Sequence, residues 1–95
     1  MPEREKIDAV RRYLENEFPG HTIHAFQDLD REAHSFRIDR NGVSHLATVA
    51  EEFLGDFSSE KISSLLHQFQ LADTLRAVGR ERVLVTSHGL QYNRS

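Results

Sequence analysis

Histidines are the side chains of this sequence best suited to bind a metal or move a proton. The chain holds six of them and no cysteine, so disulfides, zinc–cysteine sites, iron–sulfur clusters and thiol nucleophiles are excluded. His21 and His24 are close enough in the sequence to suggest a pair of metal ligands, but residues three apart on a strand point to opposite faces. We therefore predict no metal site at this pair.

Two other clusters contain residues of metal-binding or catalytic types. Asp28, Asp30 and Glu32 alternate as at the start of a calcium loop, but the central glycine and the distal glutamate of such a loop are missing. Ser87 and His88 join a nucleophile to a base, yet neighbours in extended chain point apart and no acid is placed to orient the histidine. The chain also has no glycine-rich phosphate loop, no G-x-S-x-G and no H-E-x-x-H. The sequence predicts no enzyme and no cofactor.

A β-hairpin is predicted for the stretch FRIDRNGVSHLATV, where Asn41-Gly42 supplies the two positive φ angles of a type I′ turn. One face of this hairpin would carry His34 and His45 with Phe36, Ile38, Val43, Ala47 and Val49. The other face would carry Ser35, Arg37, Asp39, Ser44, Leu46, Thr48 and Ala50. A three-residue loop with the glycine as a bulge would slip the register and turn His45 outward, but it would bury fewer apolar side chains.

The first register makes His45 a core residue that faces Ile38 and has a ring nitrogen bonded to backbone or water. His34 lies on the same face, but four residues along a ladder separate it from His45 by roughly 13 Å. Two ligands of one metal lie much closer together, because each nitrogen–metal bond is only about 2.1 Å long. We therefore predict no metal site between these histidines.

The remaining pattern predicts a helix, a strand, the hairpin, a helical region and a last strand. A helix is expected to begin near Pro2, and the apolar residues that follow, Ile7, Val10, Leu14 and Phe18, recur at spacings of three and four, which is typical of a helix with one packed face. Ser58 is expected to cap a helical region that ends at Gly79, either as one long helix or as two joined by a kink near Gln70. The expected strands cover residues 21–27, 34–40, 43–50 and 82–86.

These elements predict a single α+β domain over residues 1–95. The expected architecture is a two-layer sandwich in the order α-β-β-β-α-β, with a small three- to four-stranded mixed or antiparallel sheet and two helices on one face. The last strand should run parallel to the first or the third. Residues 88–95 are expected to form a flexible tail.

Composition indicates an ordinary globular protein. Hydrophobic residues make up 38% of the chain and charged residues 28%, with a net charge of −3. The N-terminal stretch MPEREKIDAV lacks the apolar run of a signal peptide, and no stretch approaches the roughly 18 apolar residues of a membrane span. Together with the lack of cysteine, this predicts a cytoplasmic protein that does not associate with membranes.

The leading functional prediction is a non-catalytic protein-interaction or regulatory module that forms a homodimer. An unbroken helix from Ser58 to Val78 would be about 31 Å long and would overhang a small sheet. Its surplus apolar side chains, with those of the preceding connection, would then need another surface. The predicted interface consists of Phe53, Leu54, Phe57, Leu71 and Leu75. In the alternative, these residues close one end of the core of a monomer.

Two further functional hypotheses remain open. The first is a nucleic-acid-associated module that uses an anion patch of Arg76, Arg80 and Arg82, although the acidic net charge disfavours it. Cations near the end of a helix also have a structural role, since they complement the helix dipole. The second is a small-ligand binder or enzyme with a histidine-lined pocket.

The order helix–three strands–helix is similar to that of the double-stranded-RNA-binding domain. In that family the last helix begins with a lysine-rich segment that meets phosphates. Here the corresponding segment reads SSEKISS, with the single Lys61 beside Glu60. The run RVLVT at 82–86 is an additional strand, so the likeness lies in element order alone and no residue role is carried over.

Overall fold

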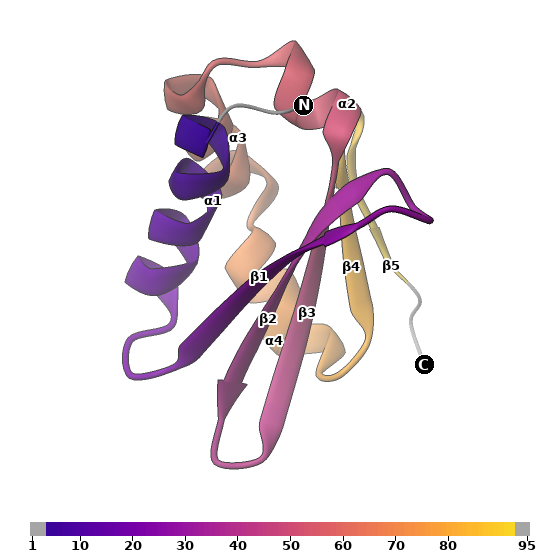
Figure 1. The fold of residues 1–95 in the computed structure, drawn as a ribbon. Coiled ribbons are helices and arrows are strands. Elements are labelled where there is room, and N and C mark those ends of the chain that lie inside the picture. Colours follow the sequence, from indigo (N-terminus) through magenta and orange to yellow (C-terminus); the bar gives the residue numbers. More distant parts are fainter. Residues whose placement is uncertain (1–3, 93–95) are drawn as a thin grey trace.

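The computed structural model describes residues 4–92 as a five-stranded sheet with helices packed on one face (Figure 1). The elements are α1 (Arg4–Glu17), β1 (Thr22–Asp28), β2 (Ala33–Arg40), β3 (Val43–Ala50), α2 (Glu51–Asp56), α3 (Ser59–Phe69), α4 (Leu71–Val78), β4 (Arg82–Thr86) and β5 (Gly89–Tyr92). The strands lie side by side in chain order, and all neighbours are antiparallel except β3 and β4, which are parallel. The predicted α+β class is confirmed.

The β2–β3 hairpin has the predicted two-residue turn. Asn41 and Gly42 have φ angles of 52° and 80°, and Arg40 pairs with Val43. On the face that meets the helices, Phe36, Ile38, Ala47 and Val49 are buried as expected, whereas Val43 beside the turn is 48% exposed. The turn therefore carries the hairpin beyond the reach of the helices.

His45 lies on the buried side of the hairpin opposite Ile38, as predicted. Its Nδ1 donates to the carbonyl oxygen of Gly79 at 2.8 Å, and its ring lies 5.6 Å from that of Phe18. A ring nitrogen bonded to backbone is thus confirmed. The bond ties the central strand to the end of α4, which is a structural role for this histidine.

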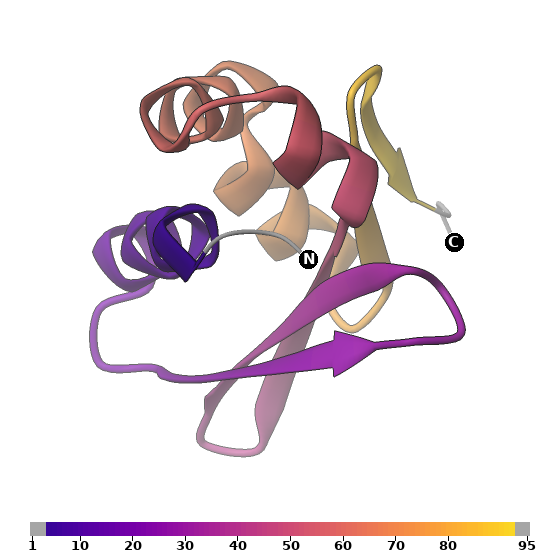
Figure 2. The same cartoon turned by 45° about the horizontal axis from the view of Figure 1, so that its top comes forward.

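The helical region after Ser58 is two helices. The Ser58 hydroxyl accepts from the amide of Lys61 at 3.2 Å and caps α3, as predicted. At Gln70 the backbone is left-handed, with φ 58° and ψ 46°, and α4 begins at the next residue. The break turns α4 back over β3 and β4, as Figure 2 shows, so no long helix overhangs the sheet.

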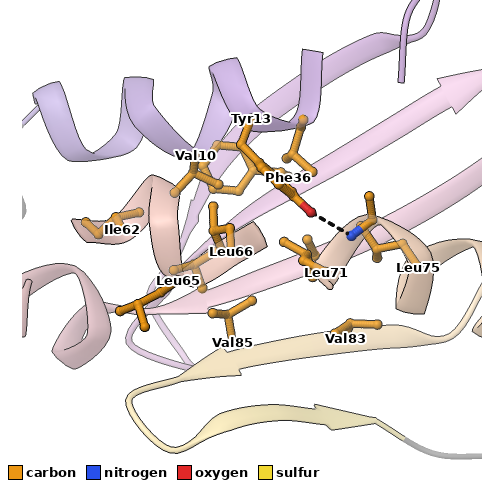
Figure 3. Close-up of a cluster of buried hydrophobic side chains, with 14 of the residues drawn as sticks. Val10, Tyr13, Phe36, Ile62, Leu65, Leu66, Leu71, Leu75, Val83 and Val85 are labelled. Carbon is orange, nitrogen blue, oxygen red and sulfur yellow. Dashed lines mark hydrogen bonds between the residues drawn. The ribbon is translucent and has the colours of Figure 1, made fainter. Parts of the chain in front are cut away.

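Tyr13 supplies the side-chain hydrogen-bond acceptor that the start of α4 lacks. Gln70, the residue before α4, makes no side-chain capping bond. Instead the Tyr13 hydroxyl, from α1, accepts from the amide of Ala72 at 3.0 Å (Figure 3). Tyr13 is 3% exposed, and burial raises the pKa of its hydroxyl. One buried hydrogen bond therefore joins α1, the first helix of the chain, to α4, the last.

Two segments differ from the sequence prediction. Residues 51–56, expected to be a plain connection, form α2 and bury Phe53 and Leu54. Residues 89–92, expected within a flexible tail, form β5 against β4. The Thr86 hydroxyl donates to the carbonyl of Gly89 and accepts from the amide of His88, which stabilises the tight β4–β5 turn. Residues 88–95 are thus ordered at least as far as Tyr92, and 93–95 lie outside the described residues.

The core lies between the sheet and the helices, and Figure 3 shows its centre. Alternate residues of β2, β3 and β4 point into it, as the period of a strand requires. The fully buried side chains that the sheet contributes to this core are Phe36, Ile38, Ala47, Val49, Val83 and Val85, and those from the longer helices include Val10, Leu14, Ile62, Leu66, Leu71 and Leu75. All helical packing is thus directed at one face of the sheet.

Replacement of Tyr13 by Phe should destabilise the protein by about 1–3 kcal/mol, because the buried amide of Ala72 would lose its acceptor. Urea unfolding measures the change. Tyr92→Phe is the matched control, since Tyr92 is 38% exposed. Equal stability of the two variants would contradict a capping role for Tyr13.

Alkaline pH should remove part of the stability that the Tyr13 hydroxyl contributes to the folded protein. The folded state keeps the Tyr13 hydroxyl protonated above its ordinary pKa, so only the unfolded state loses this proton as the pH first rises past about 10. The stability advantage of the wild type over Tyr13→Phe should therefore be constant below that pH and narrow above it. Urea unfolding of both proteins along a pH series measures the gap, and a gap that widens would refute the assignment.

Candidate binding surface

The sheet face turned away from the helices carries the exposed side chains that the fold does not use for its core. It is built from alternate residues of all five strands, and we call it the open face. Three of the rows that cross it are Phe26, Ser35, Thr48, Leu84 and Gln91 in the first, His24, Arg37, Leu46 and Arg82 in the second, and Thr22, Asp39 and Ser44 in the third. None of the helices described for residues 4–92 packs on it, because their apolar stripes all meet the other face.

Part of the open face is apolar. Phe26 is 46% exposed, and Leu46 and Leu84 are half-buried. Between Phe26 and Leu84, the hydroxyls of Ser35 and Thr48 are fully buried and hydrogen-bonded to each other at 3.0 Å. The exposed surface beside this buried pair is therefore contributed by Phe26, Leu46 and Leu84 rather than by the two hydroxyls.

A polar cluster lies beside this apolar part. The Asp39 carboxylate accepts from the Ser44 hydroxyl at 2.5 Å and from Arg37 Nε at 2.9 Å, and His24 Nε2 lies 3.8 Å away. The Ser44 bond, followed by that of Arg37, holds the pKa of Asp39 below its ordinary value. A catalytic triad needs the histidine between serine and acid, whereas here the acid lies in the middle. The cluster is therefore a fixed patch of mixed charge rather than a nucleophile with its base.

The interface predicted from the sequence is not exposed. Phe53, Leu54, Leu71 and Leu75 are each 0% exposed, and Phe57 is half-buried with its ring 5.3 Å from that of Phe53. The prediction assumed an overhanging helix, and the break at Gln70 folds those residues back into the core. They close one end of the core, as the monomer alternative proposed.

The three arginines of the predicted anion patch do not converge. Arg76 points toward α1, where it donates to the carbonyl of Glu17, pairs with Asp73 at 3.2 Å and lies 4.7 Å over the ring of Phe18. Arg82 lies on the open face, across the sheet from Arg76. Arg80 is exposed in the turn between α4 and β4. The sheet thus separates Arg76 from Arg82, and Arg80 lies in a turn.

The six histidines are also dispersed. His24 is on the open face, and His34 and His45 are on the helical face. His67 packs against Tyr13, His21 bonds the carbonyl of Pro19, and His88 is in the β4–β5 turn. A hollow between α1 and α3 is lined by Glu5, Asp8, Ala9, Arg12, Ser59, Glu60 and Ser63, and one beside β4 and β5 by Arg82, Leu84, Gln91 and Tyr92. Neither hollow contains a histidine, and no group of three or more potential metal ligands occurs among residues 4–92.

Comparison with known proteins gives no further guide, because the chain matches no protein-family model, no curated protein and no solved structure. Across residues 4–92, every helix is too short or too polar to cross a membrane.

The sequence predicts part of the open face but not how far it extends across the sheet. The hairpin pattern placed Ser35, Leu46 and Thr48 on one side, but it could not show that Phe26 and Leu84 extend the same row. The available signal was the alternation in β1 and β4, which places Phe26 and Leu84 opposite the core residues of their own strands.

Substitution of Ser44 by Ala should raise the pKa of Asp39 toward its ordinary value, since the hydroxyl that stabilises the carboxylate is lost. An NMR titration of the Asp39 side-chain carbonyl reports this pKa directly. Ser64→Ala, on the exposed side of α3, is the control. An Asp39 titration that is the same in both variants would show that Ser44 has no such effect.

Proposed function

We propose that this protein is a non-catalytic interaction module that works as a homodimer, with the apolar part of the open face around Phe26 at or beside its interface. The observation that carries the proposal is the exposure of Phe26, 46%, next to half-buried leucines on a face that no described helix covers. Burial of an aromatic ring and its neighbours is the largest favourable contribution that such a face offers a partner.

The charges near the apolar part of the open face favour a second copy as the partner. The open face carries His24, Arg37 and Arg82 as well as Asp39. A surface that holds both signs has groups that complement its own under a two-fold axis, whereas a nucleic acid would call for cations alone. The separation of Arg76 from Arg82 by the sheet also weighs against a phosphate-binding patch.

A non-catalytic role is supported by the chemistry of the polar groups. The Ser44 hydroxyl is bound to a carboxylate rather than to a histidine, and Ser87 likewise donates to Asp56 at 2.8 Å. Neither of these two serine hydroxyls is therefore paired with the histidine that commonly activates a serine nucleophile. These contacts rigidify the surface, which suits recognition of a fixed partner.

Phe26→Ser should convert the homodimer to a monomer of 11.0 kDa, because it removes the most exposed ring of the open face without touching the core. Sedimentation equilibrium of the full chain at micromolar concentration measures the mass. Leu29→Ser is the matched control, since Leu29 is also exposed, at 75%, but lies in the β1–β2 loop outside the open face. The control should remain a dimer.

A wild-type protein that sediments as a monomer throughout this range would remove the proposed function. Equal weakening of self-association by Phe26→Ser and Leu29→Ser would retain the dimer but remove Phe26 from its interface.

A further inference from the structure

We propose that the second copy docks along strand β1, so that β1 pairs antiparallel with the β1 of its partner about a two-fold axis at Ala25. The inference rests on the proposed homodimer and specifies its geometry. β1 is one edge of the sheet, and in Figure 2 it runs along the near side of the molecule with no described helix or strand in front of it. The opposite edge strand, β5, has only four residues.

Edge strands normally carry features that prevent such pairing, and β1 has few of them. The strand reads TIHAFQD and contains no lysine, proline or glycine, and its one acid is at the end. Natural edges use lysine, proline, bulges or short length to block addition of another strand. One partial guard is present, since Arg11 Nη1 donates to the carbonyl of Ile23 at 3.3 Å. A carbonyl oxygen has two lone pairs, so this bond leaves room for a second donor.

The register of the hairpins determines which backbone groups of β1 are free. In a two-residue turn the closing pair, Arg40 and Val43, exchanges hydrogen bonds, so the even-numbered residues of β2 bond to β3. The odd-numbered residues of β2 therefore bond to β1, where they face Thr22, His24, Phe26 and Asp28. The groups directed at the free edge are then those of Ile23, Ala25 and Gln27. The Arg11 bond to the Ile23 carbonyl agrees with this assignment.

Pairing about Ala25 uses all of these groups. Ala25 meets its own copy, and Ile23 meets Gln27 of the partner in two symmetry-related pairs. Every free N–H and C=O along this stretch gains a partner. An axis at Ile23 or at Gln27 would leave some of them unpaired, so Ala25 is the centre that satisfies the edge best.

The side chains suit the same register. On the open face, Phe26 lies opposite His24 of the partner subunit, and the two cross-strand aromatic pairs cover the ring that is exposed in the monomer. Asp28, the one charged residue of β1 apart from the histidine, lies opposite Thr22 of the partner, so no like charges meet. The two five-stranded sheets then form one continuous sheet.

Cysteine cross-linking tests this geometry, because the native chain has no cysteine to interfere. In the proposed dimer the two Ala25 Cα atoms are about 5.5 Å apart, within the range of about 4.4–6.8 Å that a disulfide spans. Ala25→Cys should therefore form a covalent dimer under mild oxidation. Leu29→Cys, exposed in the loop, is the control and should cross-link only slowly by collision.

A mixed experiment fixes the register and avoids dependence on one variant. In the proposed dimer, position 23 of one subunit lies opposite position 27 of the partner. Ile23→Cys and Gln27→Cys should therefore each cross-link poorly alone and should form a covalent heterodimer when the two proteins are mixed. Circular dichroism confirms that each variant is folded.

The outcomes separate this inference from the proposed function. A protein that sediments as a dimer, but whose Ala25→Cys variant and Ile23→Cys/Gln27→Cys mixture cross-link no faster than Leu29→Cys, uses another surface, and the β1 pairing is wrong while the homodimer stands. A protein that stays monomeric removes both. Strong cross-linking of Ile23→Cys with itself would show a different register and would also overturn the axis at Ala25.

Discussion

The two-residue turn at Asn41-Gly42 is the constraint on which the rest of this structure depends. Because side chains and hydrogen-bonding directions both alternate along a strand, the pairing of Arg40 with Val43 sets the orientation of every residue in β2 and β3. The same alternation passes to β1 and β4 through their pairing. It decides which face receives the helices, which face is left open and which backbone groups reach the free edge. A slip of one residue would reverse these assignments in the strand that slipped.

The helical layer follows from this arrangement and is held by few polar contacts. Tyr13 caps α4 from α1, and His45 bonds the end of α4 from the central strand. The first contact fixes where α4 begins and the second fixes where it ends. Gln70, in a left-handed conformation that costs roughly 1–2 kcal/mol for a non-glycine residue, is tolerated because the packing on either side of it requires the turn. The short α4 then completes the core over β3 and β4.

Most of the fold could be predicted from the sequence, because it is encoded in short-range patterns. The spacing in α1, the Asn-Gly turn and the Ser58 cap are each readable within a few residues. The sequence does not decide between one helix and two at Gln70, since glutamine carries no intrinsic signal for a left-handed conformation. The tyrosine that caps the next helix is also far away in the chain. β5 was missed because a four-residue strand next to the terminus gains its stability from pairing with β4 rather than from its own composition.

The candidate surface was harder to predict for the same reason. The expectation of an interface at Phe53 to Leu75 came from apolar residues that a long helix could not bury, and the tertiary turn at Gln70 buries them. The sequence does not distinguish Phe26, because a single apolar residue in an alternating strand is ordinary. Its importance depends on the row of residues beside it and on the absence of a covering helix among residues 4–92, and both are properties of the assembled sheet.

Amide hydrogen exchange of the unsubstituted protein, measured at increasing concentration, tests the central claim most directly. We expect the free-edge amides of Ile23, Ala25 and Gln27 to exchange rapidly in dilute solution and to become protected as dimers form, while the amides of His24 and Phe26, bonded within the sheet, change far less. Edge amides that exchange at the same rate in dilute and concentrated samples would contradict an interface along β1.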